Sequence, residues 1–352
     1  MEKAKHKALP SLLSAGLSGQ AKNVTLFVLM ALILVSFSIL RPDRFPTVRN
    51  FRSMLAQFPE FGLLTVAMML SMVVGGIDLS VVAVANLCGV LAAIILAAGK
   101  TAGILPGGTL VALAALAVLA AAALSGTVNG VLISLAGVPP ILATLGTQGL
   151  LMGLAIIFTR GHGITGFPAE IDVIGNGFIA GVPVPFLLFA VITAAVAFML
   201  KKTRHGFTMY MLGANPVVSR YSGVNNAAVI IRTYMTTGIL AGISALIMIS
   251  RTNSMRPGYG TDYLLQAILV AVLGGTDPRG GAASMTGLVM GIMILQFTQS
   301  GLNIMAFSAF TKKLIWGLAL LLIMVLNFLI AKYNERRRIR SMRAASENTT
   351  GE

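Results

Sequence analysis

The sequence is poor in cysteine, in histidine and in charge. Cys88 is the single cysteine of 352 residues, so the chain cannot form an internal disulfide. The three histidines, His6, His162 and His205, stand far apart and leave no cluster with metal-ligand spacing. Charged residues make up 11% of the chain, whereas a soluble domain has about 25%. These scarcities exclude a disulfide-rich secreted protein and argue against a soluble domain.

Long apolar runs take the place of the missing charge. Hydrophobic residues make up 56% of the chain and occur in continuous blocks. Strands of an outer-membrane barrel would show ten-residue alternation, so the blocks predict membrane-spanning helices. The first block follows the basic stretch KAKHK and lacks a small-residue cleavage site, which favours a retained first span over a signal peptide. We therefore expect an all-α integral membrane protein.

One apolar run, residues 61–98, holds the acidic residue Asp78. Its 38 residues would form a helix of about 57 Å, almost twice the hydrocarbon thickness, so it must contain two spans. The glycine pair Gly75 and Gly76 disfavours helix where the division should fall. We expect Asp78 at this junction, where it can cap the second helix together with Ser80 or reach water. A carboxylate at the bilayer centre would cost roughly 2.5 to 3.5 kcal/mol.

The same length argument predicts about ten transmembrane helices, some of them short or broken. An even count places both termini on one side, and that side receives 16 of the 26 lysines and arginines. The positive-inside rule then predicts that both termini are cytoplasmic. The spans are expected near residues 24–40, 61–76, 79–98, 106–124, 137–158, 183–200, 228–250, 264–275, 284–300 and 314–331.

The domain organisation follows from these spans. Residues 1–23 and 332–352 form cytoplasmic tails, the second of them basic, around a transmembrane domain of residues 24–331. Within that domain, residues 201–227 form a long polar and basic cytoplasmic segment. Asn215 and Pro216 are typical of a helix start, so the segment is either a short amphipathic helix along the membrane or a solvated loop.

Close helix contacts are predicted from paired glycines. Four pairs have the small-x-x-x-small spacing that lets membrane helices approach each other backbone to backbone. They are Gly126 with Gly130, Gly149 with Gly153, Gly238 with Gly242, and Gly287 with Gly291.

No nucleotide-binding motif is recognisable. The tripeptide at 99–101 resembles the end of a phosphate-binding loop, but Ile94 stands where that motif needs glycine. LSGQ at 17–20 lacks one glycine of the signature of transport ATPases. We therefore expect no cofactor in this chain and assign any ATP-driven work to a partner.

Six segments, in this order, resemble the permease subunits of bacterial ribose-type sugar ABC importers. The resemblance runs from about residue 24 to 331, which is nearly the whole chain. The segments are GGIDLS (75–80), VNGVLI (128–133), ILATLGTQGLLMGL (141–154), RHGFTMYMLGANPVVSRYSGVNN (204–226), AILVAVLGGTDPRGG (267–281) and GLNIMAFSAFTKKLIWGLALLL (301–322).

The resemblance implies a non-catalytic permease of the bacterial inner membrane. Such a subunit dimerises, binds two cytoplasmic ABC ATPase subunits that hold ATP and Mg²⁺, and receives a monosaccharide or similar small polyol from a periplasmic binding protein. The family's ATPase-coupling segment corresponds here to Gly213, Ala214, Asn215, Ser219, Ser222 and Gly223.

The chain departs from the family pattern after GGIDLS and at position 214. Val81-Val82-Ala83 replaces the usual Val-Gly-Ser, and Ala214 stands where glycine is frequent. Whether the second permease of the dimer is an identical copy or a paralogue therefore stays open.

Polar residues within or near the spans are the candidates for a translocation path. Amides, hydroxyls and an aromatic face suit a sugar, although such groups also form hydrogen bonds between helices, worth about 0.6 kcal/mol each. The candidates are Asn86, Asn129, Thr144, Gln148, Gln296, Phe297 and Asn303.

Two further sets of residues complete the expected sites. Arg251 and Arg256 lie outside the membrane in this topology, where they meet either acidic residues of the binding protein or lipid headgroups. Gly75, Gly76 and Asp78, with the similar pair Gly274 and Gly275 in GGTD, are expected at helix junctions that act in gating.

Two other functional classes compete with this interpretation of the sequence. A proton-coupled secondary sugar transporter would use Asp78 as its carrier, because an intramembrane ionisable residue is functional by default. The predicted spans hold no second acidic or histidine partner for it. A membrane-embedded enzyme would need a nucleophile, an acid–base pair or a metal cluster, and none has recognisable spacing.

Overall fold

The computed structural model describes residues 5–103, 105–323 and 325, with side chains from residue 23 onward. The chain forms two compact units, residues 1–307 and 308–352. The described part of the second unit is a helix over 309–323. The prediction of an all-α membrane protein is confirmed.

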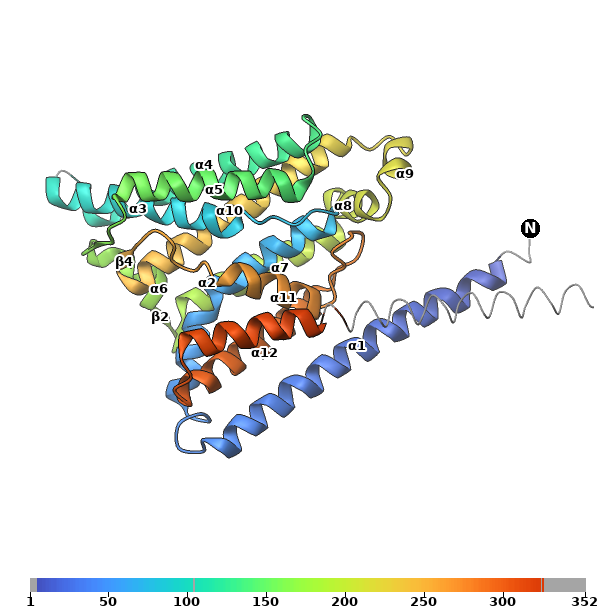
Figure 1. Ribbon diagram of the computed structural model, residues 1–352, viewed down its shortest axis with the longest axis horizontal. Helices are drawn as coiled ribbons and strands as arrows, with labels where there is room; N and C mark the ends of the chain where they lie inside the picture. Colours follow the sequence, from blue (N-terminus) through green and yellow to red (C-terminus); the bar gives the residue numbers. More distant parts are fainter. Residues whose placement is uncertain (1–4, 104, 324, 326–352) are drawn as a thin grey trace, which may run out of the picture. The chain divides into compact units, whose positions relative to one another are not determined.

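The first unit consists of helices joined by short connections (Figure 1). Two antiparallel pairs of two-residue strands, β1 with β4 and β2 with β3, brace its loops. The elements are α1 (Lys5–Leu40), α2 (Val48–Val73), α3 (Val81–Ala102), α4 (Gly107–Ser134), α5 (Pro140–Thr159), β1 (Ile164–Thr165), the 3₁₀ turn η1 (Ala169–Ile171), α6 (Asp172–Asn176), β2 (Phe178–Ile179), β3 (Val182–Pro183), α7 (Val184–Lys202), α8 (Arg204–Ala214), α9 (Pro216–Tyr221), α10 (Asn226–Thr252), β4 (Ser254–Met255), α11 (Tyr263–Leu273) and α12 (Met285–Ile304).

Nine of the ten predicted spans correspond to helices of the first unit. Eight of these helices are long and apolar enough to cross a membrane, whereas α11 has 11 residues and crosses about half of one. The predicted tenth span begins within the helix at 309–323, and most of its residues beyond 323 lie outside the described part of the chain.

Helix α2 begins thirteen residues before the predicted span. Its first turns carry Arg49 and Arg52, which the sequence placed in an outer loop. The Thr47 side chain accepts a hydrogen bond from the Asn50 N–H (3.2 Å) and caps the helix. Hydropathy missed these turns because they are amphipathic.

The core of the first unit is formed by α2, α3 and α10. Helix α10 packs along α4 and against both α2 and α3. Glycines allow the closest approaches: a Cβ added at Gly126 would lie 2.1 Å from the Tyr234 carbonyl oxygen, and one at Gly238 would lie 2.2 Å from that of Ala122. The predicted glycine contacts are therefore confirmed between α4 and α10.

The other two glycine pairs differ. A Cβ at Gly287 would lie 2.0 Å from the Gly274 carbonyl oxygen, so α12 and α11 also meet as predicted. Gly149 and Gly153 on α5 have no atom of the described chain within 4 Å of an added Cβ. Their predicted contact is not made within the described part of the chain.

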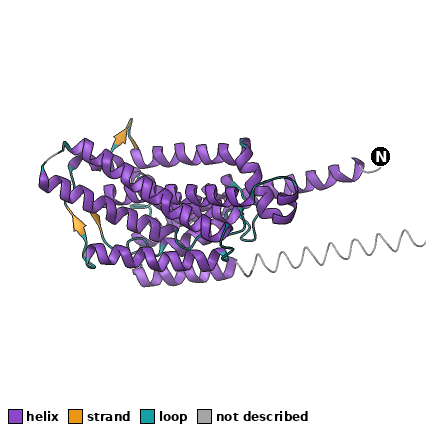
Figure 2. Cartoon of the chain, turned by 90° about the horizontal axis from the view of Figure 1, so that it is seen from above, coloured by secondary structure: helices purple, strands orange, loops and turns teal. Residues whose placement is uncertain are grey.

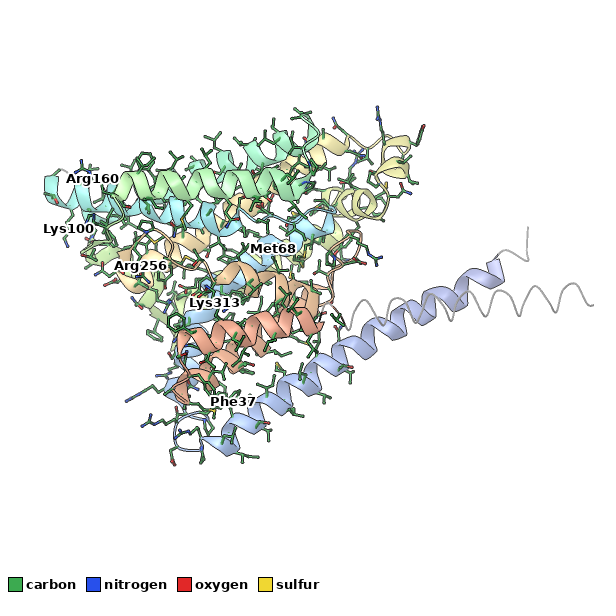
Figure 3. The ribbon with its side chains drawn as sticks, in the orientation of Figure 1. Phe37, Met68, Lys100, Arg160, Arg256 and Lys313 are labelled. Atoms are coloured by element: carbon green, nitrogen blue, oxygen red, sulfur yellow. The ribbon has the colours of Figure 1, made fainter. Side chains whose placement is uncertain are left out.

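The two ends of the helical unit have different characters. We call one end the junction face; it holds residues 74–80, 203–225 and 274–284 (Figure 1). The other end, the loop face, holds the connections 160–183 and 253–262 and all four short strands (Figure 2). Lys100, Arg160 and Arg256 lie toward the loop face (Figure 3). The positive-inside rule predicts that the junction face is cytoplasmic.

Candidate functional site

The first junction, residues 74–80, separates α2 from α3 as the sequence predicts. The N–H groups of Gly75 and Gly76 donate to the carbonyl oxygens of Met72 (2.9 Å) and Ser71 (3.0 Å). Gly75 has φ +85°, a left-handed conformation that ends the helix and favours glycine. The glycine pair thus turns the chain out of α2.

Asp78 is buried in this junction, with 2% of its surface exposed. Its Oδ1 accepts hydrogen bonds from the backbone N–H (3.0 Å) and the hydroxyl (2.6 Å) of Ser80. Its Oδ2 accepts from the Thr237 hydroxyl of α10 at 3.2 Å. Of the two roles predicted for Asp78, burial argues against contact with water, whereas its carboxylate does accept from the Ser80 N–H just before α3. The Ser80 side chain itself makes no cap hydrogen bond, because its hydroxyl bonds the carboxylate. The carboxylate ties the junction to α10.

Side chains of α4 and α5 hold the same junction. The Leu79 N–H donates to the Thr144 hydroxyl, which in turn lies 3.1 Å from the Ile77 carbonyl oxygen. Asn129 donates from its Nδ2 to the Ser80 hydroxyl at 2.7 Å. Asn129 and Thr144 were predicted in the translocation path. Here they form hydrogen bonds between elements, and their role in the path stays a prediction.

The second glycine junction, after α11, has the same local turn. The Gly275 N–H donates to the Val272 carbonyl oxygen (3.1 Å) and the Thr276 N–H to that of Ala271 (3.0 Å). Gly275 has φ +99°, as Gly75 has a positive φ in the first junction. Both turns end a helix at the junction face, so the GGID and GGTD motifs have the same orientation (Figure 1).

Gly213 brings α8 into contact with both junctions. A Cβ added there would lie 1.9 Å from the Val73 carbonyl oxygen at the end of α2 and 2.5 Å from the Gly281 nitrogen. The Gly281 N–H also donates to the Val73 carbonyl oxygen at 3.0 Å. The last turn of α8, the end of α2 and the loop after α11 therefore form one close backbone contact.

The predicted coupling segment forms two short helices, α8 and α9. Asn215 separates them and caps α9, because its Oδ1 accepts from the N–H groups of Val217 (2.9 Å) and Val218 (3.1 Å). The predicted helix start at Pro216 is confirmed. Ser219 is buried and bonds Asn226 of α10 at 2.8 Å, while Ala214, Ser222 and Gly223 are exposed.

A buried ion pair near the loop face was not predicted. Glu60 of α2 is fully buried and accepts from Arg251 of α10 through Oε1 (2.8 Å) and Oε2 (3.1 Å). The Tyr263 hydroxyl also donates to Glu60, and Arg251 donates to the Tyr259 hydroxyl at 3.2 Å. The sequence missed Glu60 because the predicted span began one residue later.

The ion pair distinguishes the two arginines that were predicted to dock a binding protein. Arg251 is engaged inside the chain, whereas Arg256 is exposed. The docking role stays a prediction. Of the two arginines, Arg256 is the one whose side chain is exposed and accessible to a partner.

Asn86 fixes the loop at 253–262 to α3. Its Nδ2 donates to the carbonyl oxygens of Tyr259 (3.2 Å) and Arg256 (3.4 Å), and its Oδ1 accepts from the Gly258 N–H (3.3 Å). Asn86 and Gln148 line one small cavity of about 40 Å³.

The remaining path candidates lie on α12, away from that cavity's lining. Phe297 packs in an apolar cluster with Phe45 and Met54, and Asn303 is exposed near the end of the helix. Gln296 is buried. Their role in a translocation path stays a prediction.

Comparison with known proteins places these features in a family. The family model described as the permease component of the branched-chain amino acid transport system matches residues 50–326. The ribose import permease protein RbsC of Escherichia coli K12 is 34% identical over 312 residues, which cover 88% of this chain and 93% of that protein.

The names of two other relatives specify different transported compounds. The D-allose transport system permease protein AlsC of Escherichia coli K12 is 26% identical over 313 residues, 87% of this chain and 91% of that protein. The autoinducer 2 import system permease protein LsrD of Klebsiella pneumoniae is 29% identical over 336 residues, 94% and 98% of the two chains. No solved structure matches the chain. This multi-pass inner-membrane protein belongs to the family of transport-system permease components.

Proposed function

We propose that the chain is the membrane-spanning subunit of an ATP-binding cassette importer for a monosaccharide or a similar small polyol. A periplasmic binding protein delivers the substrate, and separate cytoplasmic subunits bind ATP and Mg²⁺ and hydrolyse the nucleotide. The names of the relatives, which specify ribose, D-allose and autoinducer 2, support this substrate class. The chain itself carries out no chemical reaction.

The contact at Gly213 carries the proposal. At Gly213, the backbone of α8 lies directly against the end of α2 and against the loop after α11, because glycine has no side chain to separate them. Displacement of α8 therefore has to move both glycine junctions, because backbone atoms in contact cannot yield as a flexible side chain can. An ATPase that pushed on this segment would act on two membrane helices at once.

Helix α9 offers the surface for that push. Val217, Val218 and Tyr221 are apolar or aromatic and are 61%, 54% and 89% exposed. Exposed apolar groups gathered on a short helix mark an interaction surface. We assign this surface, with Ala214, Asn215, Ser222 and Gly223 beside it, to contact with the ATPase.

Helix α5 offers a surface for the second permease. Added Cβ atoms at Gly146, Gly149 and Gly153 meet no atom of the described chain, so a helix of another subunit can approach closely there. Gln148 lies on the same helix and lines the small cavity with Asn86. We assign the translocation path to the interface between the two permeases, with Gln148 beside it. Such a path suits a substrate that needs hydrogen bonds but no tight binding site.

Proton-coupled transport through Asp78 is not favoured. A carrier must exchange protons with water, whereas Asp78 is buried and its oxygens accept hydrogen bonds from Ser80 and Thr237. Glu60 is likewise held, by Arg251 and Tyr263.

The test is uptake by the reconstituted transporter. The chain is placed in vesicles with its co-encoded ATPase and binding protein, and uptake of the sugar that the binding protein retains on purification is measured. We expect uptake to require ATP and to survive a protonophore. Uptake that proceeds without ATP and stops on addition of the protonophore would contradict the proposal.

A further inference from the structure

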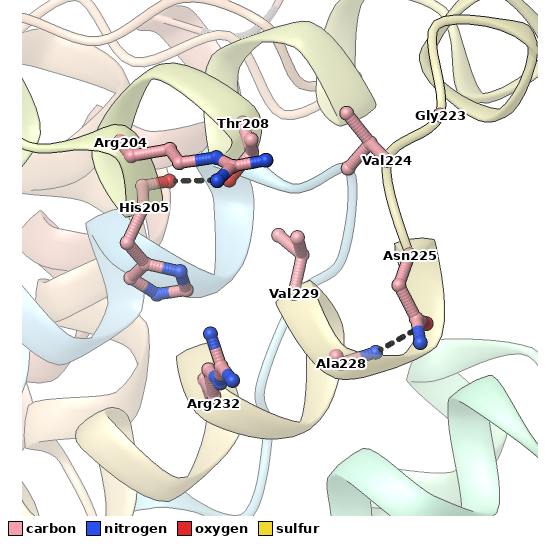
Figure 4. Close-up of a pocket in the computed structure, with 9 residues that line it drawn as sticks. All are labelled: Arg204, His205, Thr208, Gly223, Val224, Asn225, Ala228, Val229 and Arg232. Atoms are coloured by element: carbon pink, nitrogen blue, oxygen red, sulfur yellow. Dashed lines mark hydrogen bonds between the residues drawn. The ribbon is translucent and has the colours of Figure 1, made fainter.

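A pocket of about 370 Å³ opens at the junction face between α8, the connection after α9 and the start of α10 (Figure 4). Its volume lies within the range of about 300 to 1,000 Å³ that is typical of ligand sites. Arg204 and His205 of α8 and Arg232 of α10 contribute the charged and titratable groups of its lining. None of the residues predicted to contact the ATPase lines it except Gly223.

The two guanidinium groups at this pocket have no acidic partner among the described residues. Neither Arg204 nor Arg232 forms an ion pair within the described part of the chain, although the half-buried Arg251 and the exposed Arg279 do so. Two like charges beside one cavity repel each other, and an anion between them would relieve that repulsion. Guanidinium groups are also the preferred partners of phosphate oxygens, since they donate hydrogen bonds in a fixed fork.

His205 provides a second, independent indication. Its Nε2 is buried and has no hydrogen-bond partner in the described structure. Burial, and then the positive charge of Arg232, lowers the pKa of this imidazole from its ordinary value. A buried polar atom beside a cavity is commonly satisfied by a bound group, because an unmade hydrogen bond is costly.

The backbone adds positive potential at the same place. Arg204, His205 and Thr208 belong to the first turns of α8, and Ala228 and Val229 belong to the first turn of α10. The amino-terminal ends of helices carry partial positive charge and favour anions. Side chains and backbone thus favour the same kind of ligand.

We propose that this pocket binds a phosphate group, carried by an anionic lipid headgroup or by a small phosphate ester in the cytoplasm. Arg204 and Arg232 hold the phosphate oxygens from two helices, and His205 lies beside them. The position suits either source, because α8 follows the end of the membrane helix α7 after a single residue. A bound phosphate would link α8 to α10 and so restrict the motion of the predicted coupling segment between them, residues 213–223.

Thermal unfolding of the purified full-length chain in neutral detergent tests this proposal. The unfolding midpoint is titrated with phosphatidylglycerol, with inorganic phosphate and glycerol phosphate, and with phosphatidylcholine as the neutral lipid. The Arg204→Gln/Arg232→Gln variant removes both guanidinium groups, which are exposed, so the core is untouched. Arg220→Gln removes an exposed guanidinium on the same face outside the pocket and serves as the matched control.

We expect a saturable rise of the midpoint in the wild type and in Arg220→Gln, and an affinity weaker by about tenfold or more in the double variant. A response to phosphatidylglycerol alone identifies a lipid site, and a response to the soluble phosphates identifies a metabolite site. If the double variant does not purify, the single variant Arg204→Gln must still bind more weakly than Arg220→Gln. Equal affinities, or no saturable response to any anion, would overturn the proposal.

Discussion

Two buried carboxylates of this protein are held in different ways, and the contrast separates a rigid region from a movable one. Glu60 forms a two-point ion pair with Arg251 and also accepts from Tyr263, so its charge is matched inside the chain. Asp78 accepts from the hydroxyls of Ser80 and Thr237 and from a backbone N–H, and no ion pair to it occurs in the described residues.

The difference has a mechanical consequence. An ion pair out of water is costly to break, because each separated charge remains buried. Hydrogen bonds from a hydroxyl or a backbone N–H to a carboxylate are worth about 1.5 to 3 kcal/mol each, and they can be exchanged one at a time without separating two opposite charges. We infer that the Glu60 pair fixes α2 to α10 near the loop face, while the junction at Asp78 can rearrange when α8 moves.

Breaking the ion pair is expected to have the largest effect. Arg251→Met leaves the Glu60 carboxylate buried and unpaired, so we expect the free energy of unfolding to fall by about 3 to 5 kcal/mol. Thermal unfolding in detergent measures it. Arg256→Met, which removes an exposed arginine of the same loop region, should cost less than about 0.5 kcal/mol.

A second variant shows whether the lone charge is the cause. Glu60→Gln/Arg251→Met removes both charges and should recover most of the loss. Similar unfolding midpoints for the single and the double variant would show that the Arg251 side chain acts through packing instead.

A methyl group at the three-way backbone contact is expected to have the next largest effect. Gly213→Ala places Cβ 1.9 Å from the Val73 carbonyl oxygen, so α8 must shift away from α2, at a cost of about 1 to 3 kcal/mol. The control is Gly108→Ala, where an added Cβ meets nothing within 4 Å. A Gly213→Ala protein as stable and as active as the control would contradict the close contact.

Neutralising Asp78 is expected to have a smaller effect. The side chain of Asp78→Asn keeps the size of the carboxylate and one acceptor oxygen for Ser80, and its amide can donate to Thr237. We expect a loss of about 1 kcal/mol and ATP-driven uptake within a few-fold of the wild type. Loss of all uptake by a folded protein would instead favour a proton carrier.

Charge reversal at Arg256 should leave stability unchanged and give the smallest effect. If Arg256 meets acidic groups of the binding protein, Arg256→Glu should weaken docking most at low ionic strength. The measurement is the binding-protein concentration for half-maximal uptake at low and high salt. The same salt dependence in variant and wild type would remove Arg256 from the docking surface.

The sequence was sufficient for the features that depend on local chain properties. Run length and the glycine pair located the junction at Gly75, since both act within a few residues. Hydropathy did not predict the start of α2, because an amphipathic turn does not raise the mean hydropathy of the segment. Hydropathy also placed Glu60 just outside its predicted span. The ion pair could not be predicted, because its partner Arg251 is 191 residues away in the sequence. Spatial pairs of this kind cannot be read from one sequence.

The predicted sites show the same division. The motif predicted which segment couples to the ATPase, and that role stays a prediction. The structure adds that Gly213 in this segment contacts both junctions. The polar path candidates could not be sorted, because Asn86, Asn129 and Thr144 look alike in sequence whether they meet a substrate or a neighbouring helix. The structure adds the hydrogen bonds that each of them makes within the chain.

The most direct test of the central claim is ATP hydrolysis by the reconstituted transporter with a charge on the exposed surface of α9. Val218→Glu alters that surface, and Leu135→Glu alters an apolar residue, 67% exposed, in the connection between α4 and α5. If α9 couples the ATPase to the membrane helices, Val218→Glu should reduce the stimulation of hydrolysis by the loaded binding protein about tenfold or more, the effect expected of a central interface residue. Leu135→Glu should retain it. Full stimulation in a folded Val218→Glu protein would contradict the account.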